Sequence, residues 1–354
     1  MKTNVADSKQ VKLSCRNVWK VYGSEPDKFF NKANGQVSDS ATHADTIREQ
    51  QHIVANANVS FDVHAGEIFV IMGLSGSGKS TIVRCLSRLV EPTAGEIILD
   101  GEDLLGKSAE ELIDIRRHKM GMVFQSFGLM PHLTVIDNIA FPLKLQGKPE
   151  QERYAQAQRV IELVGLEGRE NNYPKQLSGG QQQRVGIARS LAVEPDIWFL
   201  DEPFSALDPL IRKQMQDEFL KLQDILKKTI VFITHDFEEA IRLADRIAIM
   251  KDGAVEQCAT PGEIVMNPAT EYVRKFTEDI DKARVVTVGA LARASAHTAA
   301  ADGNALDSEA TIQGLARQLI NDTRAFMPVQ DKGGALLGTI KRQDALDLLL
   351  GAEG

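Results

Sequence analysis

The sequence predicts an α/β fold in which a parallel sheet carries a phosphate-binding loop. Residues 73–80 read GLSGSGKS and follow an apolar run at residues 67–72. Two further apolar runs, residues 197–200 and 230–233, have the length of strands that are buried on both faces of a parallel sheet. Between these two runs, apolar residues recur at helical spacing, which predicts a crossover helix.

Composition limits the class of protein. The 354 residues suffice for one large domain and a smaller one. A net charge of -8 argues against a nucleic-acid partner, which requires a basic face. The first ten residues are polar, and no apolar run approaches the length of about 18 residues that spans a membrane. We therefore expect a cytoplasmic chain whose membrane role, if it has one, acts through a partner.

The cysteines Cys15, Cys85 and Cys258 are widely spaced and include no C-x-x-C pair. This spacing favours buried thiols in a reducing compartment over a metal site. We expect these side chains to contribute packing only.

The N-terminal part predicts two strands on either side of a polar insertion. Residues 11–22 and 57–63 have strand patterns, whereas residues 24–51 contain few core residues. That composition favours a solvated insertion or a mobile loop. A helix over residues 79–89 and a short strand at residues 96–101 follow.

The middle of the chain predicts helices, and the sheet resumes after them. Residues 125–191 are mostly helix-patterned and contain four prolines. Asp208 and Pro209 have the pattern of an N-cap followed by proline at the first helical position, so the crossover helix should begin there. Residues 251–253 read KDG between two apolar segments and predict a hairpin.

The loop at residues 73–80 matches G-x-x-x-x-G-K-[ST] between a strand and a helix. Its glycines let backbone N–H groups surround phosphate oxygens, and the helix N-terminus adds partial positive charge. Lys79 would reach the β- and γ-phosphates of a nucleoside triphosphate, and Ser80 would ligate Mg²⁺. The predicted phosphate contacts are Gly73, Ser75, Gly76, Ser77, Gly78, Lys79, Ser80 and Thr81.

A phosphate loop alone indicates only a nucleoside triphosphate, and the class comes from its companions. Residues 177–181 read LSGGQ and open a helix-patterned segment, so the Ser178 hydroxyl and the following N–H groups suit another phosphate. About twenty residues later an apolar strand ends in Asp201 and Glu202. This combination resembles the ABC ATPases. The resemblance implies an ABC-type P-loop ATPase core with a helical subdomain, and ATP contacts from Ser178, Gly179, Gly180 and Gln181.

The resemblance also implies catalytic roles. Asp201 would hold the magnesium shell through water, and Glu202 would be the general base that polarises the attacking water. Gln125 resembles the Q-loop glutamine, which contacts Mg²⁺ and that water, and His235 resembles the switch histidine, which touches the γ-phosphate. Tyr22 aligns with the aromatic residue that stacks on adenine. A structural carboxylate, a surface glutamine, a core histidine and a core tyrosine are the alternative explanations.

Residues 205–208 resemble the D-loop, which bridges two subunits and brings Asp208 to the nucleotide. In the family two subunits meet head to tail, so ATP would lie between residues 73–81 of one chain and residues 178–181 of the other. The resemblance thus implies a homodimer with two composite sites. Hydrolysis would then depend mainly on positioning and charge neutralisation.

Longer segments resemble a narrower group, the ATP-binding subunits of glycine betaine, proline and choline importers, and most closely the choline branch. These segments are MGLSGSGKST, FSALDPLIR and RIAIMKDG, and the insertion at 24–51 is a further feature of that group. The resemblance implies integral membrane permease subunits, a periplasmic solute-binding protein and a position at the cytoplasmic face of the bacterial inner membrane. Residues 127–138 would face the permease through Leu129, Met130 and Leu133, unless these side chains form subdomain core.

The C-terminal part resembles a different module. Segments at 325–333, 336–340 and 344–346 are similar to the second half of a CBS domain, so we expect an ATPase domain at 1–281, with its helical subdomain at about 125–191, and a single degenerate CBS-like α+β module at 282–354. Lys341 stands where adenosine-binding CBS domains carry Ser or Thr, although Asp344 is retained. A regulatory or dimer-supporting role and a passive appendage both remain open.

Three other functions compete with this interpretation. An importer ATPase for another solute, such as methionine or a polyamine, would share every motif. A non-transport ABC ATPase usually carries two cassettes, a long coiled coil or a basic face, none of which the sequence indicates. A P-loop kinase or GTPase has no use for residues 178–181. Selectivity for the solute should reside in partner proteins.

Overall fold

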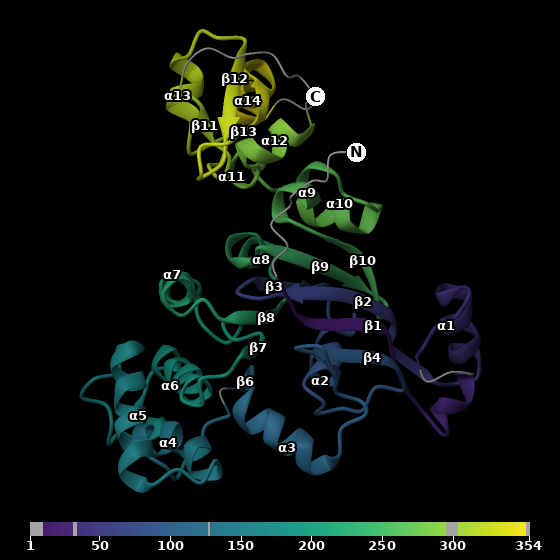
Figure 1. The fold of residues 1–354 in the computed structure, drawn as a ribbon, viewed down its shortest axis with the longest axis vertical. Helices are drawn as coiled ribbons and strands as arrows, with labels where there is room; N and C mark the ends of the chain where they lie inside the picture. The colour runs from purple at the N-terminus through teal and green to yellow at the C-terminus, as the bar shows by residue number, and fades with distance from the viewer. Residues whose placement is uncertain (1–9, 31–33, 127, 295–303, 352–354) are drawn as a thin grey trace. The chain divides into compact units, whose positions relative to one another are not determined.

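The computed structural model describes residues 10–30, 34–126, 128–294 and 304–351. The chain divides into two compact units, Met1–Val255 and Glu256–Gly354, whose elements are labelled in Figure 1. The boundary that the sequence suggested after residue 281 stays a prediction, and each unit is described separately below.

The first unit contains a largely parallel sheet. Its strands are β3 (Ile68–Met72), β6 (Met120–Val123), β7 (Ile197–Asp201), β8 (Thr229–Thr234), β9 (Arg246–Lys251) and β10 (Ala254–Ala259), of which β10 continues past residue 255. The strand order is β10-β9-β3-β8-β7-β6, and the pairs from β9 to β6 are parallel. β3, β7 and β8 are buried along their whole length, which confirms the prediction of strands covered on both faces.

A second sheet of the first unit is antiparallel. It contains β1 (Val11–Tyr22), β2 (Ile53–His64), β4 (Ala94–Leu99) and β5 (Glu102–Asp103), in the order β2-β1-β4-β5. β1 has the predicted bounds, whereas β2 begins four residues before the predicted strand because Asn56 is buried within it and interrupts the apolar pattern. The pairing of β1 with β2 ends where Tyr22 lies opposite Ile53.

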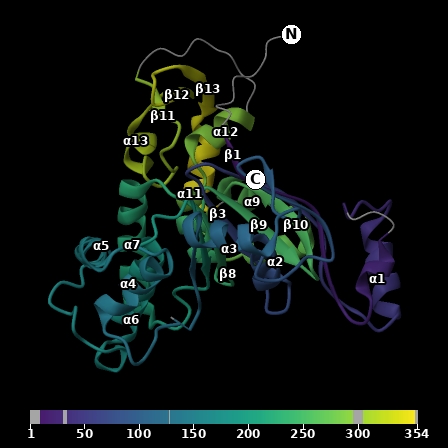
Figure 2. The same cartoon turned by 60° about the horizontal axis from the view of Figure 1, so that its bottom comes forward.

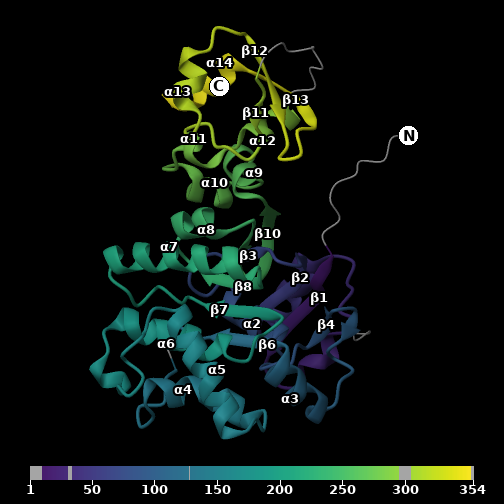
Figure 3. The ribbon, with the colours of Figure 1, turned by 60° about the vertical axis from the view of Figure 1, so that its left-hand side comes forward.

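Helices surround the parallel sheet. They are α2 (Lys79–Leu86), α3 (Ala109–His118), α4 (Val135–Leu145), α5 (Glu150–Leu163), α6 (Gly179–Leu191), α7 (Pro209–Leu226) and α8 (Phe237–Leu243), with a short 3-10 helix η2 (Pro174–Gln176). Figures 1 and 3 show α4, α5 and α6 gathered as one helical group beyond β6. The predicted N-cap is confirmed, since the Asp208 carboxylate accepts a hydrogen bond from Ile211 N at the start of α7.

The insertion differs from the expected solvated or mobile loop. Its described part forms a 3-10 helix η1 (Pro26–Phe29) and α1 (Ser40–Glu49). Ala44 and Ile47 are buried in a cluster with Trp19 of β1, and the Phe30 ring lies 5.4 Å from the Trp19 ring. The expectation was wrong because the strands, and not the insertion, supply most of this core. Figures 1 and 2 show α1 at the edge of the unit, apart from α4, α5 and α6.

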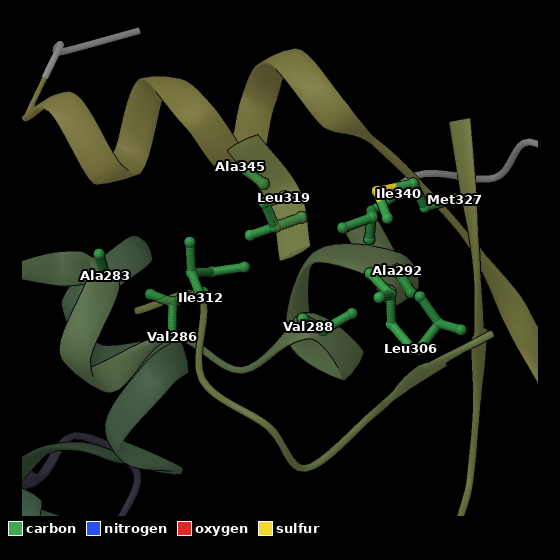
Figure 4. Packing of buried hydrophobic residues seen from close by; sticks show 11 residues of the cluster. Ala283, Val286, Val288, Ala292, Leu306, Ile312, Leu319, Met327, Ile340 and Ala345 are labelled. Carbon is green, nitrogen blue, oxygen red and sulfur yellow. The ribbon is translucent and has the colours of Figure 1, made fainter. Parts of the chain in front are cut away.

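The second unit is a small α+β unit. It contains α9 (Pro261–Met266), α10 (Glu271–Thr277), α11 (Lys282–Val285), α12 (Val288–Ala294), β11 (Leu306–Asp307), α13 (Ala316–Asn321), β12 (Phe326–Gln330), β13 (Leu336–Lys341) and α14 (Arg342–Leu350). β12 pairs in parallel with β11 and antiparallel with β13. Figure 4 shows its apolar core, in which Leu319 and Ala345 lie close together. Within the described ranges of both units, no helix combines the length and apolarity that crossing a membrane requires.

Two of the three cysteines are buried as predicted. Burial raises the pKa of Cys15 and Cys85, to about 12 for Cys85, so both remain thiols at neutral pH. Cys258 is only partly buried, which corrects the expectation that all three belong to the core.

Candidate active site

The loop at residues 73–78 joins β3 to α2, as the sequence predicted. Gly73 has a φ of 151°, and a Cβ atom there would stand 2.2 Å from the carbonyl oxygen of Met250. Gly78 has a φ of 96°, and its Cβ would stand 2.3 Å from the carbonyl oxygen of Ala55. Only glycine fits at these two positions, because both the conformation and the neighbouring backbone exclude a side chain.

Lys79 is buried, and its ammonium group lies against the loop. Nζ donates hydrogen bonds to the carbonyl oxygens of Gly73, at 2.7 Å, and Leu74, at 3.0 Å. Burial lowers the pKa of Lys79, and the carboxylates of Glu202 and Asp201 act in the opposite direction. A cation held at the mouth of such a loop can bind phosphate oxygens.

The first turn of α2 meets the end of β7. Ser80 Oγ donates a hydrogen bond to Asp201 Oδ1 at 3.2 Å. Burial raises the pKa of Asp201, and this hydrogen bond opposes the rise. A hydroxyl beside a carboxylate offers oxygen ligands of the kind that Mg²⁺ prefers. Of the other predicted contacts, Ser75 and Gly76 are exposed, Ser77 is buried and Thr81 is partly buried.

Glu202 has an uncommon backbone conformation. Its φ of 46° lies in the left-handed region that few residues other than glycine adopt. Its N–H donates to the carbonyl oxygen of Ile233 in β8 at 3.1 Å, so the sheet holds the residue in this conformation. Strained residues of this kind cluster at functional sites.

Two side chains from distant parts of the chain meet the Glu202 carboxylate. Gln125 Nε2 donates to Glu202 Oε2 at 3.3 Å, and His235 Nδ1 lies 3.1 Å from the same oxygen. Gln125 also donates to Ser205 Oγ at 3.3 Å, and this hydroxyl donates to the Glu202 carbonyl oxygen at 3.0 Å. The three predicted catalytic residues therefore form one cluster, which can orient a water molecule and accept its proton.

Tyr22 lies at the end of β1 and is not a core residue. It is 44% exposed, and Lys20 Nζ stands 4.8 Å from the centre of its ring. Exposure rules out the packing alternative and leaves ring surface available for stacking on a base.

The LSGGQ segment forms the start of α6, in the helical group of α4, α5 and α6. Ser178 is the N-cap: its Oγ accepts a hydrogen bond from Gln181 N at 3.3 Å, and Gln181 Oε1 accepts from Ser178 N at 3.0 Å. Ser178 and Gly179 are exposed. The first N–H groups of the helix therefore lie at the surface, where an anion can reach them.

Sequence reasoning missed several residues that hold these loops. Asn56 is buried in β2, and its Nδ2 donates to the carbonyl oxygen of Gly78 at 3.1 Å. Arg212 joins the segment at 205–208 to the residue after His235. It donates to the carbonyl oxygen of Leu207 at 3.1 Å and pairs with Asp236 at 3.5 Å. No local pattern identifies such residues, although a polar residue inside a strand, such as Asn56, is a signal.

The segment expected to face a membrane partner is held by hydrogen bonds to a buried side-chain amide. Buried Asn138 donates to the carbonyl oxygens of Met130, Leu133 and Thr134 and accepts from Met130 N. Leu129, Met130 and Leu133 are partly buried, between the two expected arrangements. Phe127 lies outside the described residues.

A groove of about 530 Å³ runs beside this segment. Its walls come from α3, β6, α4 and α6 and combine apolar with basic side chains, among them Arg116, Met122, Phe124, Phe141, Leu145 and Arg189. Arg189 also donates to the carbonyl oxygen of Gly128 at 2.6 Å, so the groove and the loop after Gln125 share a residue.

Comparisons with known proteins agree with this geometry. A family model described as "ABC transporter" matches residues 56–205. The trimethylamine N-oxide transport system ATP-binding protein TmoW of Ruegeria pomeroyi is 61% identical over 96% of this chain and 97% of its own length, and the TmoW of Pelagibacter ubique is 54% identical over 93% and 94%. The glycine betaine transport ATP-binding protein OpuAA of Bacillus subtilis is 52% identical over 80% of this chain and 67% of its own length.

Solved structures of ATP-binding cassettes also resemble this chain. The dimeric post-hydrolysis structure of the ATP-binding cassette MJ0796 bound to ADP and Pi is 35% identical, with a TM-score of 0.57 over 70% of this chain and 98% of that one. The chain therefore belongs to the family of ABC transport-system ATP-binding subunits and is an ATPase that drives transport.

Proposed function

We propose that the solute of this transport system is trimethylamine N-oxide. The support is the 61% and 54% identity to two relatives named for that transport, which extends over both units of the chain. A relative named for choline transport is 47% identical over 65% of this chain. These identities favour trimethylamine N-oxide over choline, the solute that the motifs suggested, within one group of small amine importers.

The phosphate loop would hold ATP. Lys79 would turn from the carbonyl oxygens of Gly73 and Leu74 to the β- and γ-phosphates, exchanging two neutral acceptors for anionic ones. The exposed face of Tyr22 would stack on the adenine ring. Ser80, Asp201 and Gln125 would hold Mg²⁺, which neutralises phosphate charge when bound.

Hydrolysis would be carried out at Glu202. Its carboxylate would accept the proton of a water molecule that attacks the γ-phosphate, while Gln125 and His235 orient the carboxylate from two sides. Positioning and electrostatic stabilisation supply most of the acceleration in phosphoryl transfer. The observation that carries this proposal is the convergence of two side chains, Gln125 and His235, on one carboxylate oxygen of Glu202.

The active form would be a homodimer. The exposed helix N-terminus at Ser178, Gly179, Gly180 and Gln181 would bind the phosphates held by the partner's loop, with Asp208 beside the junction. The support is the resemblance to MJ0796, whose solved structures are described as dimeric.

Transport requires a partner in the membrane, and we place its docking site at the groove beside residues 128–138. Apolar walls and the basic side chains Arg116, Arg117 and Arg189 suit a short amphipathic segment with acidic ends. Integral permease subunits would supply that segment, and a periplasmic solute-binding protein would deliver the solute. The chain would then work at the cytoplasmic face of the membrane.

For the C-terminal module we retain a regulatory or dimer-supporting role. It has its own apolar core, and Leu336 and Leu337 are exposed on β13, at an edge of its sheet. Removal of the residues after Lys282 should alter the dependence of transport on ionic strength. Unchanged transport at every ionic strength would leave the passive appendage as the explanation.

The solute can be tested by ATP turnover of the chain assembled with permease and binding protein in liposomes. We expect trimethylamine N-oxide to stimulate turnover and Glu202→Gln to abolish the stimulation. Stimulation by choline or glycine betaine alone would contradict trimethylamine N-oxide as the solute but would still agree with an amine importer. Stimulation by methionine alone would contradict the whole amine assignment.

A further inference from the structure

The insertion joins β1 to β2, and none of the steps proposed above uses it. We propose that it is a positioning element of the nucleotide site, in which Arg48 of α1 holds the β9–β10 turn against the phosphate loop. This inference rests on the proposed role of residues 73–81 in phosphate binding.

The β9–β10 turn lies directly against the phosphate loop. Gly253 N donates to the carbonyl oxygen of Ser77 at 3.2 Å, and a Cβ atom on Gly78 would stand 3.4 Å from Gly253 Cα. On its other side the Gly253 carbonyl oxygen accepts from Ala57 N of β2 at 2.9 Å. Because Asp252 and Gly253 have φ values of 49° and 87°, they form the tight left-handed pair of a hairpin. A displaced turn would therefore displace Ser77.

Arg48 fixes this turn from the insertion. Its Nη2 donates to the Asp252 carbonyl oxygen at 3.0 Å, a contact between residues 204 positions apart. Its Nη1 pairs with Asp45, one helical turn earlier, at 2.9 Å. Both side chains of this ion pair are largely exposed, so the pair contributes little to the position of the guanidinium group, and the hydrogen bond to Asp252 is the contact through which Arg48 holds the turn.

α1 gives Arg48 a fixed base. Ile47, the residue before it, is fully buried in the cluster that contains Trp19. His52 closes the end of the insertion, with Nε2 2.9 Å from the carbonyl oxygen of Ser24 and Nδ1 2.8 Å from that of Gln50. The insertion is thus attached where His52 meets Ser24, in the apolar cluster around Ile47, and at the β9–β10 turn through Arg48. We call this arrangement the brace.

A brace at this place should act on nucleotide binding. The N–H groups of the loop bind phosphate best when they are already arranged, because ordering them on binding costs conformational entropy. The loop contacts the phosphates before and during hydrolysis, so loosening it should raise KM for ATP and leave kcat nearly unchanged. A purely structural insertion would instead lower thermal stability with no selective change in KM.

The test compares three variants of the full chain. Arg48→Met removes the hydrogen bond to Asp252 and keeps an apolar stem, Arg48→Lys retains a donor, and Asp45→Asn removes the ion pair while sparing the bond to Asp252. We expect Arg48→Met to weaken binding of a fluorescent ATP analogue and to raise KM about fivefold. Hydrogen exchange at the Gly253 amide should accelerate, Arg48→Lys should recover part of the loss, and Asp45→Asn should stay near wild type.

The outcomes separate this inference from the function on which it rests. Wild-type affinity and wild-type exchange at Gly253 in Arg48→Met would overturn it, and so would an equal loss in Asp45→Asn. Lys79→Ala is measured in parallel. If Lys79→Ala loses nucleotide binding and Arg48→Met does not, only the brace is wrong. If Lys79→Ala binds as wild type does, the phosphate site is wrong and the brace with it.

Discussion

His235 Nδ1 lies 3.1 Å from Glu202 Oε2, and Gln125 Nε2 donates a hydrogen bond to the same oxygen at 3.3 Å. His235 follows β8, Glu202 follows β7 and Gln125 lies beyond the end of β6. These strands are neighbours and parallel, so their carboxyl ends meet at one edge. A single oxygen is thereby fixed by two residues that the chain keeps far apart.

Replacement of Glu202 with Gln should preserve ATP binding and remove turnover. The amide has nearly the same shape but cannot accept a proton, so kcat should fall by about 10²–10⁴. Steady-state hydrolysis and equilibrium ATP binding, measured on the same preparation, check both halves of this expectation. Hydrolysis at the wild-type rate would remove Glu202 from its role as general base.

Asp201→Asn should stabilise the nucleotide-free protein. Burial raises the pKa of Asp201, so the folded chain holds that proton more tightly than the unfolded chain does. The ionised carboxylate therefore costs folding free energy at neutral pH, and this cost disappears as the pH falls through the raised pKa. The variant should melt about 2 °C or more above the wild type at neutral pH, with a smaller difference in acid.

Thermal unfolding of both proteins at several pH values measures this difference. Asp201→Asn should also weaken Mg²⁺-dependent nucleotide binding, since it removes an anionic oxygen ligand beside Ser80. A variant that melts below the wild type at neutral pH would contradict the assigned cost of burying this charge.

Two inactive variants should restore activity to each other if the sites are composite. Lys79→Ala damages the phosphate loop, and Ser178→Arg blocks the exposed start of α6. In a mixed dimer, one site carries both defects and the other carries neither. Mixing the two proteins should therefore recover a substantial part of the ATPase activity that neither shows alone. Mixtures that remain inactive, although the chains exchange partners, would argue that each chain forms its own site.

Asn138→Ala should uncouple transport from hydrolysis. The buried amide makes hydrogen bonds to Met130, Leu133 and Thr134, and its loss would leave their backbone groups unpaired and cost about 2–4 kcal/mol of stability. Because these residues line the proposed permease contact, solute uptake per ATP hydrolysed should fall. The nearby Thr134→Ser variant, which keeps the N-cap hydroxyl of α4, serves as the control. Uptake per ATP equal to the wild type would show that the segment has no role in coupling.

The sequence by itself determined the fold class and the phosphate loop, because these depend on local patterns. Short apolar runs predicted buried parallel strands, the Asp208-Pro209 pair predicted the start of α7, and the glycines of residues 73–80 predicted a loop whose backbone N–H groups can surround phosphate. Each of these signals lies within a few residues of the feature that it predicts.

Tertiary structure decided what depends on strand order and register. It brought Gln125 and His235 to one oxygen of Glu202, and it left Tyr22 exposed at the end of β1. It also gave the insertion a core, because Trp19 from a neighbouring strand supplies the apolar surface that residues 24–51 lack. Contacts of this kind join residues far apart in the chain, so composition and periodicity within one segment cannot contain them.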